Sequence, residues 1–287
     1  MNRNLIAGFI FLGVISFLLI SWMMRTELVS SFMNNKPTAL KEVIEKKKEG
    51  IAGTYGIIVK NLKTGQSYSS NEERSFEAGS LYKLWVMLTA FEQIEKGELK
   101  EGEVLSEDIA DLNNAFNISS KDAELTEGGI TLSVKDALEQ MITISHNYAA
   151  LLLAQRVKIS SVSTYLKAHN FNDSNVGEPP KTTAFDIALL LEKLYKGELA
   201  NPENTQKMLE LLKRQKLNDG LPKYLPEGTQ VGHKTGDIGW FKHDVGIVFQ
   251  SSGDYIIVVL SESNSPSGAQ EKIAEISKAV FEFFKDS

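Results

Sequence analysis

The sequence predicts an α+β fold, in which an antiparallel sheet flanked by helices carries a separate helical lobe. A β-hairpin pattern spans about residues 54–70, a mostly helical block runs from about residue 80 to 216, and three strand-like stretches precede a final amphipathic helix. A sheet built from both ends of the chain and covered by the terminal helices buries these apolar faces most simply. The cleft between the sheet and the helical lobe is then the expected place for a functional site.

The composition is that of a globular protein with room for one large domain or two small ones. The chain has 287 residues, of which 42% are hydrophobic and 24% are charged, and its net charge is −6. This acidic balance argues against nucleic acid as the main partner. The absence of cysteine from the sequence excludes disulfides, thiolate catalysis and zinc–thiolate sites.

An apolar run from Leu5 to Met24 has the length of about 20 residues that a membrane-spanning helix needs. A secretory signal would have a shorter apolar core and a small-x-small cleavage site, which this run lacks. We therefore expect an uncleaved anchor over residues 1–25, a linker over 26–37 and one domain over 38–287. Cleavage of the segment and its burial as a core helix are the alternatives. A short tail before the anchor and a large domain after it favour a single-pass protein of the cell membrane, with the domain outside the cytoplasm.

The remaining elements follow from periodicity and turn residues. Residues 39–48 carry an apolar stripe at helical spacing, and residues 54–60 are rich in β-formers. Lys63-Thr64-Gly65 marks the turn before a returning strand over 66–70. Later helices are expected over 84–94, 132–144, 148–157, 183–195, 204–212 and 270–284, and later strands over 229–234, 244–250 and 255–261.

The most informative stretch is Ala78-Gly79-Ser80-Leu81-Tyr82-Lys83, which runs into the helix over 84–94. Gly79 is a structure breaker and Ser80 is a good helix-start residue. In a first helical turn, Ser80 and Lys83 share one face, with their Cβ atoms about 5–6 Å apart. An amine whose pKa is lowered can take the proton of a serine hydroxyl and make it a nucleophile. On its own, the motif is explained more simply by a capping serine followed by a surface lysine.

Two further stretches supply candidate partners. In Ser145-His146-Asn147, after the helix over 132–144, the serine can relay a proton and the asparagine amide can hold a substrate amide. A capping serine and a turn asparagine are the commoner explanation. In His233-Lys234-Thr235-Gly236-Asp237, an ammonium beside a hydroxyl can bind a carboxylate, and the glycine lets a substrate approach the backbone. An edge-strand lysine followed by a turn glycine is the alternative here.

Ser-x-x-Lys, Ser-x-Asn and Lys-Thr-Gly, in this order, resemble the penicillin-recognising serine acyl-transferases, which include the class A β-lactamases. Residues 76–83, 141–147, 181–184 and 244–248 are also similar to class A β-lactamase segments. The similarity runs from about residue 39 to the C-terminus. It implies a β-lactamase/transpeptidase-like fold, with the helical lobe at about 80–216 inserted in the α/β lobe.

The resemblance implies the catalytic roles. Ser80 would be the acylated nucleophile, and Lys83 would be its base or would tune its proton network. Ser145 would pass a proton to the leaving nitrogen. The backbone N–H groups of Ser80 and Asp237 would form the oxyanion hole. The resemblance implies no metal and no other cofactor.

The resemblance also implies which residues bind the substrate. Asn147 would hold the side-chain amide of the substrate. Lys234 and Thr235 would bind its carboxylate, with Gly236 and Asp237 beside them on the same strand.

The loop that activates water in class A β-lactamases differs here. That loop carries Glu-Pro-x-x-Asn. The corresponding loop here, residues 170–181, is shorter and contains Glu178-Pro179, but it has no asparagine at the matching position after the glutamate. Glu178 is either a remnant of the water-activating carboxylate or a solvated charge of the loop. Without a positioned base, hydrolysis of the acyl-enzyme should be slow.

Other positions also depart from the family pattern. His146 stands where an aspartate is usual, and Asp237 stands where a small neutral residue is usual. A carboxylate at Asp237 would weaken the binding of an anionic β-lactam. The extra arginine that helps to hold the substrate carboxylate has no clear match, and Lys242 and His243 are the candidates to replace it.

Three functions compete at this point: a β-lactamase-like hydrolase that opens β-lactam amide bonds, a cell-wall D-Ala-D-Ala peptidase or transpeptidase, and a sensor that is acylated once. The shortened loop favours the last two, and the close segment matches favour the first. We expect the first function, with slow deacylation. The expected partners are a small β-lactam or a peptidoglycan stem peptide, and the membrane through the N-terminal helix, with the protein a monomer.

Overall fold

The computed structural model of the chain describes residues 38–50 and 52–285. The expected anchor over residues 1–25 and the linker over 26–37 lie outside this part of the chain. Within the described ranges, no helix combines the length and the apolar character that crossing a membrane requires.

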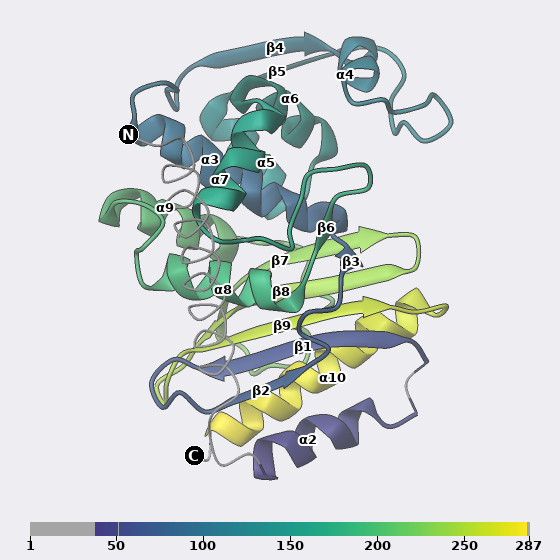
Figure 1. Ribbon diagram of the computed structural model, residues 1–287, viewed down its shortest axis with the longest axis vertical. Coiled ribbons are helices and arrows are strands. Elements are labelled where there is room, and N and C mark those ends of the chain that lie inside the picture. The colour runs from purple at the N-terminus through teal and green to yellow at the C-terminus, as the bar shows by residue number, and fades with distance from the viewer. Residues whose placement is uncertain (1–37, 51, 286–287) are drawn as a thin grey trace, which may run out of the picture.

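The centre of the fold is an antiparallel sheet of five strands: β1 (Thr54–Asn61), β2 (Ser67–Ser70), β7 (Gln230–Ile238), β8 (Phe241–Phe249) and β9 (Tyr255–Glu262). Their order across the sheet is β2-β1-β9-β8-β7 (Figure 1). Strand β1 pairs with β9 along its whole length, from Thr54 opposite Glu262 to Asn61 opposite Tyr255. Both ends of the chain therefore contribute to one sheet, as the sequence predicted.

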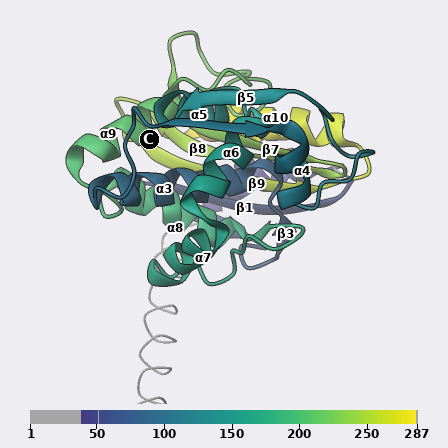
Figure 2. The same cartoon turned by 90° about the horizontal axis from the view of Figure 1, so that it is seen from above.

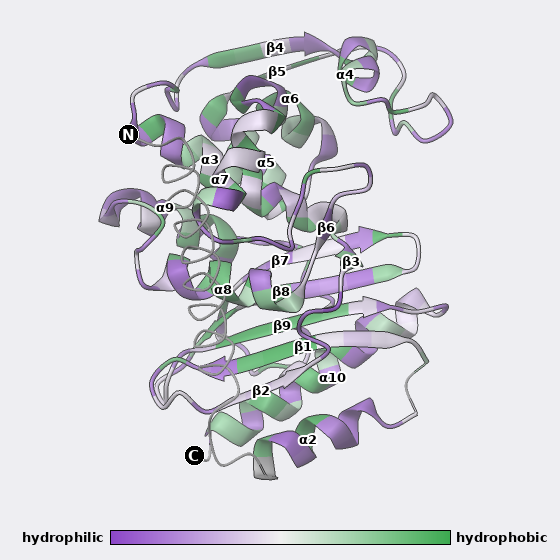
Figure 3. Ribbon diagram, viewed as in Figure 1, coloured by the Kyte–Doolittle hydropathy of each residue, from purple (hydrophilic) through white to green (hydrophobic). Residues whose placement is uncertain are grey.

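Two helices cover one face of the sheet. Helix α2 (Thr38–Lys48) and helix α10 (Pro266–Lys285) pack side by side below the strands in Figure 1. In β1, Ile57 and Val59 point into the core on this side, while Ile58 points into the core on the other side. Because both faces are covered, β1 is buried almost from end to end. Figure 3 shows apolar stretches along β1 and β9, two inner strands of the sheet.

The opposite face is covered by helix α8 (Ala184–Tyr195), which packs on β1 and β9. Thr183 caps this helix, since its Oγ1 accepts a hydrogen bond from the Asp186 N–H at 3.1 Å. The Ile and Leu residues of the helix are all buried, between the sheet and the helices beyond it. Helix α8 therefore connects the sheet to the helices farther away.

The part of the fold beyond α8 consists mainly of helices α3 (Tyr82–Glu95), α4 (Ile109–Ala115), α5 (Val134–Thr143), α6 (Asn147–Val157), α7 (Ile159–Ala168) and α9 (Pro202–Lys213). A two-stranded antiparallel sheet of β4 (Val104–Asp108) and β5 (Gly129–Ser133) lies over α5 and α6 (Figure 2). Helix α3 is buried along most of its length at the centre of this bundle. Its first turn therefore has a fixed position relative to the sheet.

The start of the predicted helix over 132–144 was wrong. Leu132 is in strand β5, opposite Leu105 of β4, and Ser133 is the N-cap of a helix that begins at Val134. The Ser133 Oγ accepts a hydrogen bond from the Asp136 N–H at 3.1 Å, which ends the strand and starts the helix. The sheet of β4 and β5, helix α4 and helix α7 were not predicted from the sequence.

A short ladder joins the sheet region to the first turn before α3. Strand β3 (Phe76–Glu77) pairs with β6 (Lys181–Thr182), and the Ala78 N–H donates to the Pro180 carbonyl at 2.7 Å. The 3₁₀ turn η1 (Gly79–Leu81) follows directly and packs against β7. The Ser80 motif is therefore held between the ladder and the edge strand of the sheet.

Candidate active site

Ser80 lies in turn η1, just before helix α3, and is partly exposed. Gly79 has φ +48°, and a Cβ at this position would lie 3.1 Å from the backbone nitrogen of Asp237. Glycine thus lets the turn lie directly against strand β7. Within the described residues, no side chain caps η1 or α3, so the explanation of Ser80 as a capping serine was wrong.

Lys83 is fully buried, with an exposed fraction of 0%, so the surface-lysine explanation was also wrong. Its Nζ donates to the Ser145 carbonyl at 2.6 Å, to the Ser145 Oγ at 3.1 Å and to the Asn147 Oδ1 at 2.6 Å. These acceptors use the three N–H bonds of an ammonium group. Burial lowers the pKa of Lys83 to about 7, against the opposing effect of the Glu124 carboxylate. Near neutral pH this amine can therefore gain or lose its proton.

Ser145 lies between α5 and α6 with φ +57°, a left-handed backbone that non-glycine residues seldom adopt. Its carbonyl and its hydroxyl both accept from Lys83 in this conformation. The N-cap of α6 is His146 instead, because its Nδ1 accepts from the Ala149 N–H at 3.1 Å. The alternative of a capping Ser145 was therefore wrong, and its unusual backbone serves the contact with Lys83.

Lys234 approaches the same hydroxyl from the sheet. Its Nζ lies 2.9 Å from the Ser145 Oγ and 2.9 Å from the Thr235 carbonyl, and the residue is 0% exposed. Burial and the nearby Lys83 hold the pKa of Lys234 well below its usual range, against the attraction of Asp244. Strand β7 is the edge strand of the sheet, as the alternative explanation assumed, but its Lys234 side chain points inward.

The rest of the Lys-Thr-Gly motif lies along β7 beside η1. Thr235 is partly exposed and Gly236 is buried. A Cβ on Gly236 would lie 2.9 Å from each of the Ala78 carbonyl oxygen, the Leu81 Cγ and the His243 Cδ2. Gly236 therefore lets β7 approach the chain's own Ser80 turn. The sequence analysis had attributed this glycine to the approach of a substrate.

Asp237 is exposed and its carboxylate forms an ion pair with Lys242 on β8. The Lys242 ammonium partly offsets the negative charge that the sequence analysis expected to disfavour anionic β-lactams. The backbone nitrogen of Asp237 lies close to the turn that holds Ser80, since a Cβ on Gly79 would lie 3.1 Å from it. Because Lys242 is paired with Asp237, it is not a free cation that could replace the missing arginine at the substrate carboxylate.

His243, the other candidate for that replacement, is buried beneath the site. Its Nε2 lies 2.8 Å from the Glu77 carbonyl, and its Nδ1 accepts from the Ser261 N–H at 3.1 Å. The ring is thus the neutral tautomer with the proton on Nε2. Burial lowers the pKa of His243 to about 4. A neutral ring with both nitrogens in use cannot hold a substrate carboxylate, so this expectation was wrong.

Glu124 is a site residue that the sequence analysis missed. Its Oε1 accepts from the Asn147 Nδ2 at 2.6 Å, so the Asn147 side chain bridges Lys83 and Glu124. Glu124 belongs to the long loop between α4 and β5, which has no apolar periodicity. Only the three-dimensional contact brings it to the site, and no sequence pattern marked it.

Glu178 is exposed, and its Oε1 accepts from the Asn117 Nδ2 at 3.3 Å. This contact joins two loops, 116–128 and 170–181, outside the group formed by Lys83, Ser145 and Lys234. The arrangement fits the solvated loop charge better than the remnant of a catalytic carboxylate.

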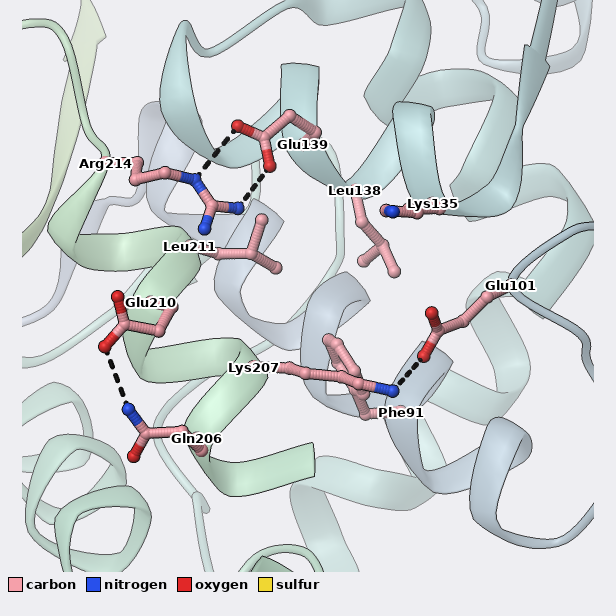
Figure 4. A pocket seen from close by; sticks show the side chains of 10 residues that line it. All are labelled: Phe91, Glu101, Lys135, Leu138, Glu139, Gln206, Lys207, Glu210, Leu211 and Arg214. Carbon is pink, nitrogen blue, oxygen red and sulfur yellow. Dashed lines mark hydrogen bonds and ion pairs between the residues drawn. The ribbon is translucent and has the colours of Figure 1, made fainter. Parts of the chain in front are cut away.

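A separate cavity of about 360 Å³ lies among α3, α5 and α9 (Figure 4). Phe91, Leu138 and Leu211 form its apolar lining, and two ion pairs cross it, Lys207–Glu101 and Arg214–Glu139. None of the motif residues lines it. Across residues 38–50 and 52–285, no group of three His, Asp or Glu side chains could hold a metal ion.

Comparisons with known proteins identify the family and the fold of the chain. The profile of the Beta-lactamase enzyme family matches residues 37–284. A β-lactamase from Sphaerobacter thermophilus DSM 20745 has a similar structure, with a TM-score of 0.76 at 23% identity, covering 88% of this chain and 99% of that chain. PBP-A gives a TM-score of 0.77 at 24% identity, covering 88% of this chain and 98% of its own. No match was found among curated protein sequences.

A variant of PBP-A was solved as an acyl-enzyme complex with penicillin G, and it gives a TM-score of 0.76 at 24% identity over 86% of this chain and 96% of that chain. At this level of identity, the solved structures establish the fold alone. The family rests on the profile, which matches nearly all of the described residues. The chain therefore belongs to the β-lactamase enzyme family of serine hydrolases.

Proposed function

We propose that the protein is a serine hydrolase that opens β-lactam amide bonds through an acyl-enzyme on Ser80. The observation that carries the proposal is the contact of two buried lysines, Lys83 and Lys234, with the hydroxyl of Ser145 beside the Ser80 turn. Burying two amines at one hydroxyl is costly for stability, and a packing role alone would not require it.

Acylation begins with the loss of the Ser80 proton. A neutral Lys83 has two N–H bonds and one lone pair, so one of its three acceptors must be given up and the lone pair can take the proton. The Ser80 Oγ then attacks the lactam carbonyl carbon. As the C–N bond breaks, the Ser145 hydroxyl gives its proton to the leaving nitrogen and regains one from an adjacent lysine ammonium.

We assign the substrate contacts by giving each residue of the three motifs the role that the family motif implies. Asn147 holds the amide of the substrate side chain, and Lys234 with Thr235 binds the carboxylate. The N–H groups of Ser80 and Asp237 receive the developing oxyanion, in a gap that Gly236 keeps narrow. No cofactor takes part in this scheme.

Deacylation is slow in this proposal. Ester hydrolysis needs a water activated by a positioned base. The exposed position of Glu178 and its contact with Asn117 support a loop charge without that role.

A D-Ala-D-Ala peptidase, or a sensor that stays acylated, is the second candidate. The exposed position of Glu178 also favours this second candidate. Without a base that activates water, a β-lactam would stay bound to the serine, and both a peptidase and a sensor would form such a long-lived acyl-enzyme. The fold likeness to PBP-A is compatible with it. In every version we propose a monomer held at the cell membrane by residues 1–25, with the catalytic domain outside the cytoplasm and with no nucleic-acid partner.

The test uses the full chain in detergent, mixed with a penicillin and followed by intact mass over time, with Ser80→Ala as the control. A Ser80-dependent adduct that decays as hydrolysed drug accumulates slowly would support the proposed hydrolase. An adduct that forms and persists would favour the second candidate, and a D-Ala-D-Ala peptide would be the next substrate. A complete absence of adduct, or rapid turnover that depends on Glu178, would contradict the proposal.

A further inference from the structure

The loop that carries Glu124 is fastened to helix α6 at two successive positions. Tyr148 Oη accepts from the Leu125 N–H at 3.0 Å and donates to the Leu125 carbonyl at 2.7 Å. The Asn113 Nδ2 also donates to that carbonyl at 2.8 Å. Tyr148 is buried, so the attachment is part of the core. Asn147 and Tyr148 therefore hold Glu124 and Leu125 as a pair.

The attachment fixes a negative charge at one side of the site. The Glu124 side chain is exposed, yet its carboxylate is held 2.6 Å from the Asn147 amide nitrogen. The other end of that amide lies 2.6 Å from the Lys83 Nζ. The same carboxylate acts against the burial that lowers the pKa of Lys83. Glu124 is thus within electrostatic reach of the amine that deprotonates Ser80.

We propose that Glu124 is a specificity-determining residue that selects acyl donors with an ammonium group next to the amide held by Asn147. This inference rests on the proposed function, because it uses Asn147 as the holder of that amide. A substituent on the carbon that follows the amide carbonyl lies within a few bonds of Asn147, and so within a few ångströms of the Glu124 carboxylate. A cation there is attracted, a neutral group is indifferent, and an anion is repelled.

The substrate class follows from this charge. The acyl donor would be a peptide, or a β-lactam that imitates one, with a free amino group beside the amide on the acyl side of the scissile bond. On the other side of the scissile bond, Lys234 and Thr235 would receive the carboxylate. The cleft would then select a zwitterionic substrate, with opposite charges recognised at its two ends.

Three penicillins with one nucleus test the idea. Benzylpenicillin has an uncharged side chain, ampicillin has an α-ammonium group and carbenicillin has an α-carboxylate. Second-order acylation rate constants are measured by intact mass with the full chain in detergent, at about pH 6, below the pKa of an α-ammonium group. The variants are Glu124→Gln and, as the matched control from the same loop, Glu127→Gln.

The expected order for the native chain is ampicillin, then benzylpenicillin, then carbenicillin. Glu124→Gln should lower the ampicillin-to-carbenicillin ratio by about tenfold, the factor that a modest partly screened charge contact supplies. Glu127→Gln should leave the ratio within about twofold. Glu124→Asp, which keeps the charge, should retain part of the preference.

Several outcomes would overturn the inference. An equal loss for all three penicillins in Glu124→Gln would mean that Glu124 only positions Asn147. If Glu124→Gln left the ampicillin-to-carbenicillin ratio unchanged, or if Glu127→Gln lowered it equally, Glu124 would not select substrates by charge. Acylation without discrimination would refute this inference but leave the proposed function standing. The absence of any benzylpenicillin adduct in the native chain would refute both.

Discussion

The Nζ of Lys234 lies 2.9 Å from the Oγ of Ser145, and the same oxygen lies 3.1 Å from the Nζ of Lys83. Both lysines are fully buried, and the two amines oppose each other's charge across one hydroxyl. Two neighbouring like charges cannot both be kept at low cost, so the pair favours the loss of a proton from one of them. The two amines and the Ser145 hydroxyl therefore form one hydrogen-bonded group, which the proposed acylation uses as its route for protons.

The acylation rate should depend on pH through Lys83. Burial lowers its pKa to about 7, and only the neutral amine can take the Ser80 proton. We expect the rate constant of acylation to rise as pH increases through about 7 and to level off above it. Intact mass or stopped-flow measurements with benzylpenicillin, whose side chain does not titrate, would record this curve. A rate that does not change between about pH 5.5 and 8.5 would show that another group is the base.

The backbone strain at Ser145 can be measured with two substitutions. Both Ser145→Ala and Ser145→Gly remove the hydroxyl and should reduce acylation severely. Glycine accepts φ +57° without strain, so the Gly variant should unfold with a free energy about 1 kcal/mol higher than the Ala variant. Urea unfolding of both variants gives the comparison. Equal stabilities, or a less stable Gly variant, would mean that the local chain stores no strain there.

Gly236 should tolerate no side chain. In Gly236→Ala, the new methyl group would meet three atoms at 2.9 Å, one of them a backbone oxygen of the Ser80 turn. We expect a loss of about 1–3 kcal/mol in the free energy of unfolding and a large fall in the acylation rate. Gly102→Ala is the control, because a Cβ there has nothing within 4 Å. Native-like acylation by Gly236→Ala would contradict the close approach of β7 and η1.

Acid should destabilise the fold through His243. Its pKa is lowered from 6.5 to about 4 in the folded chain. The unfolded chain therefore takes up the proton first as the pH falls. The free energy of unfolding should decrease between about pH 6.5 and 4, by up to about 3 kcal/mol, and this contribution should change little below that range.

His243→Gln isolates this effect, because glutamine offers a donor and an acceptor but does not titrate in this range. Thermal or urea unfolding across the pH range would give a shallower slope for the variant than for the native chain. An identical slope would assign the acid sensitivity to other groups, such as His169, whose pKa is also lowered by burial.

The sequence predicted the sheet well, and Lys83, Ser145 and Lys234, which it named from three separate motifs, are in contact in the structure. Their catalytic roles stay a prediction. Strands β1 and β9 follow from dense β-branched residues, and the order of Ser80, Ser145 and Lys234 along the chain was enough to suggest one site. The start of helix α5 could not be predicted as well from the sequence, because Leu132 continues the apolar spacing of the helix. Its place in β5 depends on pairing with Leu105, a contact that no local pattern encodes.

Other features of the site depend on tertiary contacts. Glu124 lies in an aperiodic loop, and contacts with Asn113, Asn147 and Tyr148 decide where that loop is held. His243 looked like a cation available for a substrate carboxylate. Its burial between Glu77 and Ser261 makes it a neutral support, and burial at that strand position is set by the packing of the Ser80 turn.

The pairing of β1 with β9 has a consequence for how the chain folds. Its central register joins Ile57 to Val259, so the sheet can close only after almost the whole domain has been synthesised. Pairing between segments so far apart in the sequence slows folding. The entropy cost of closing a long loop comes before the contacts between the two strands can offset it. A chain that ends before β9 would leave the apolar edge of β1 open to other chains. Premature termination would therefore produce an aggregating fragment, although the helix behind Ser80 and the loop of Ser145 would both be present.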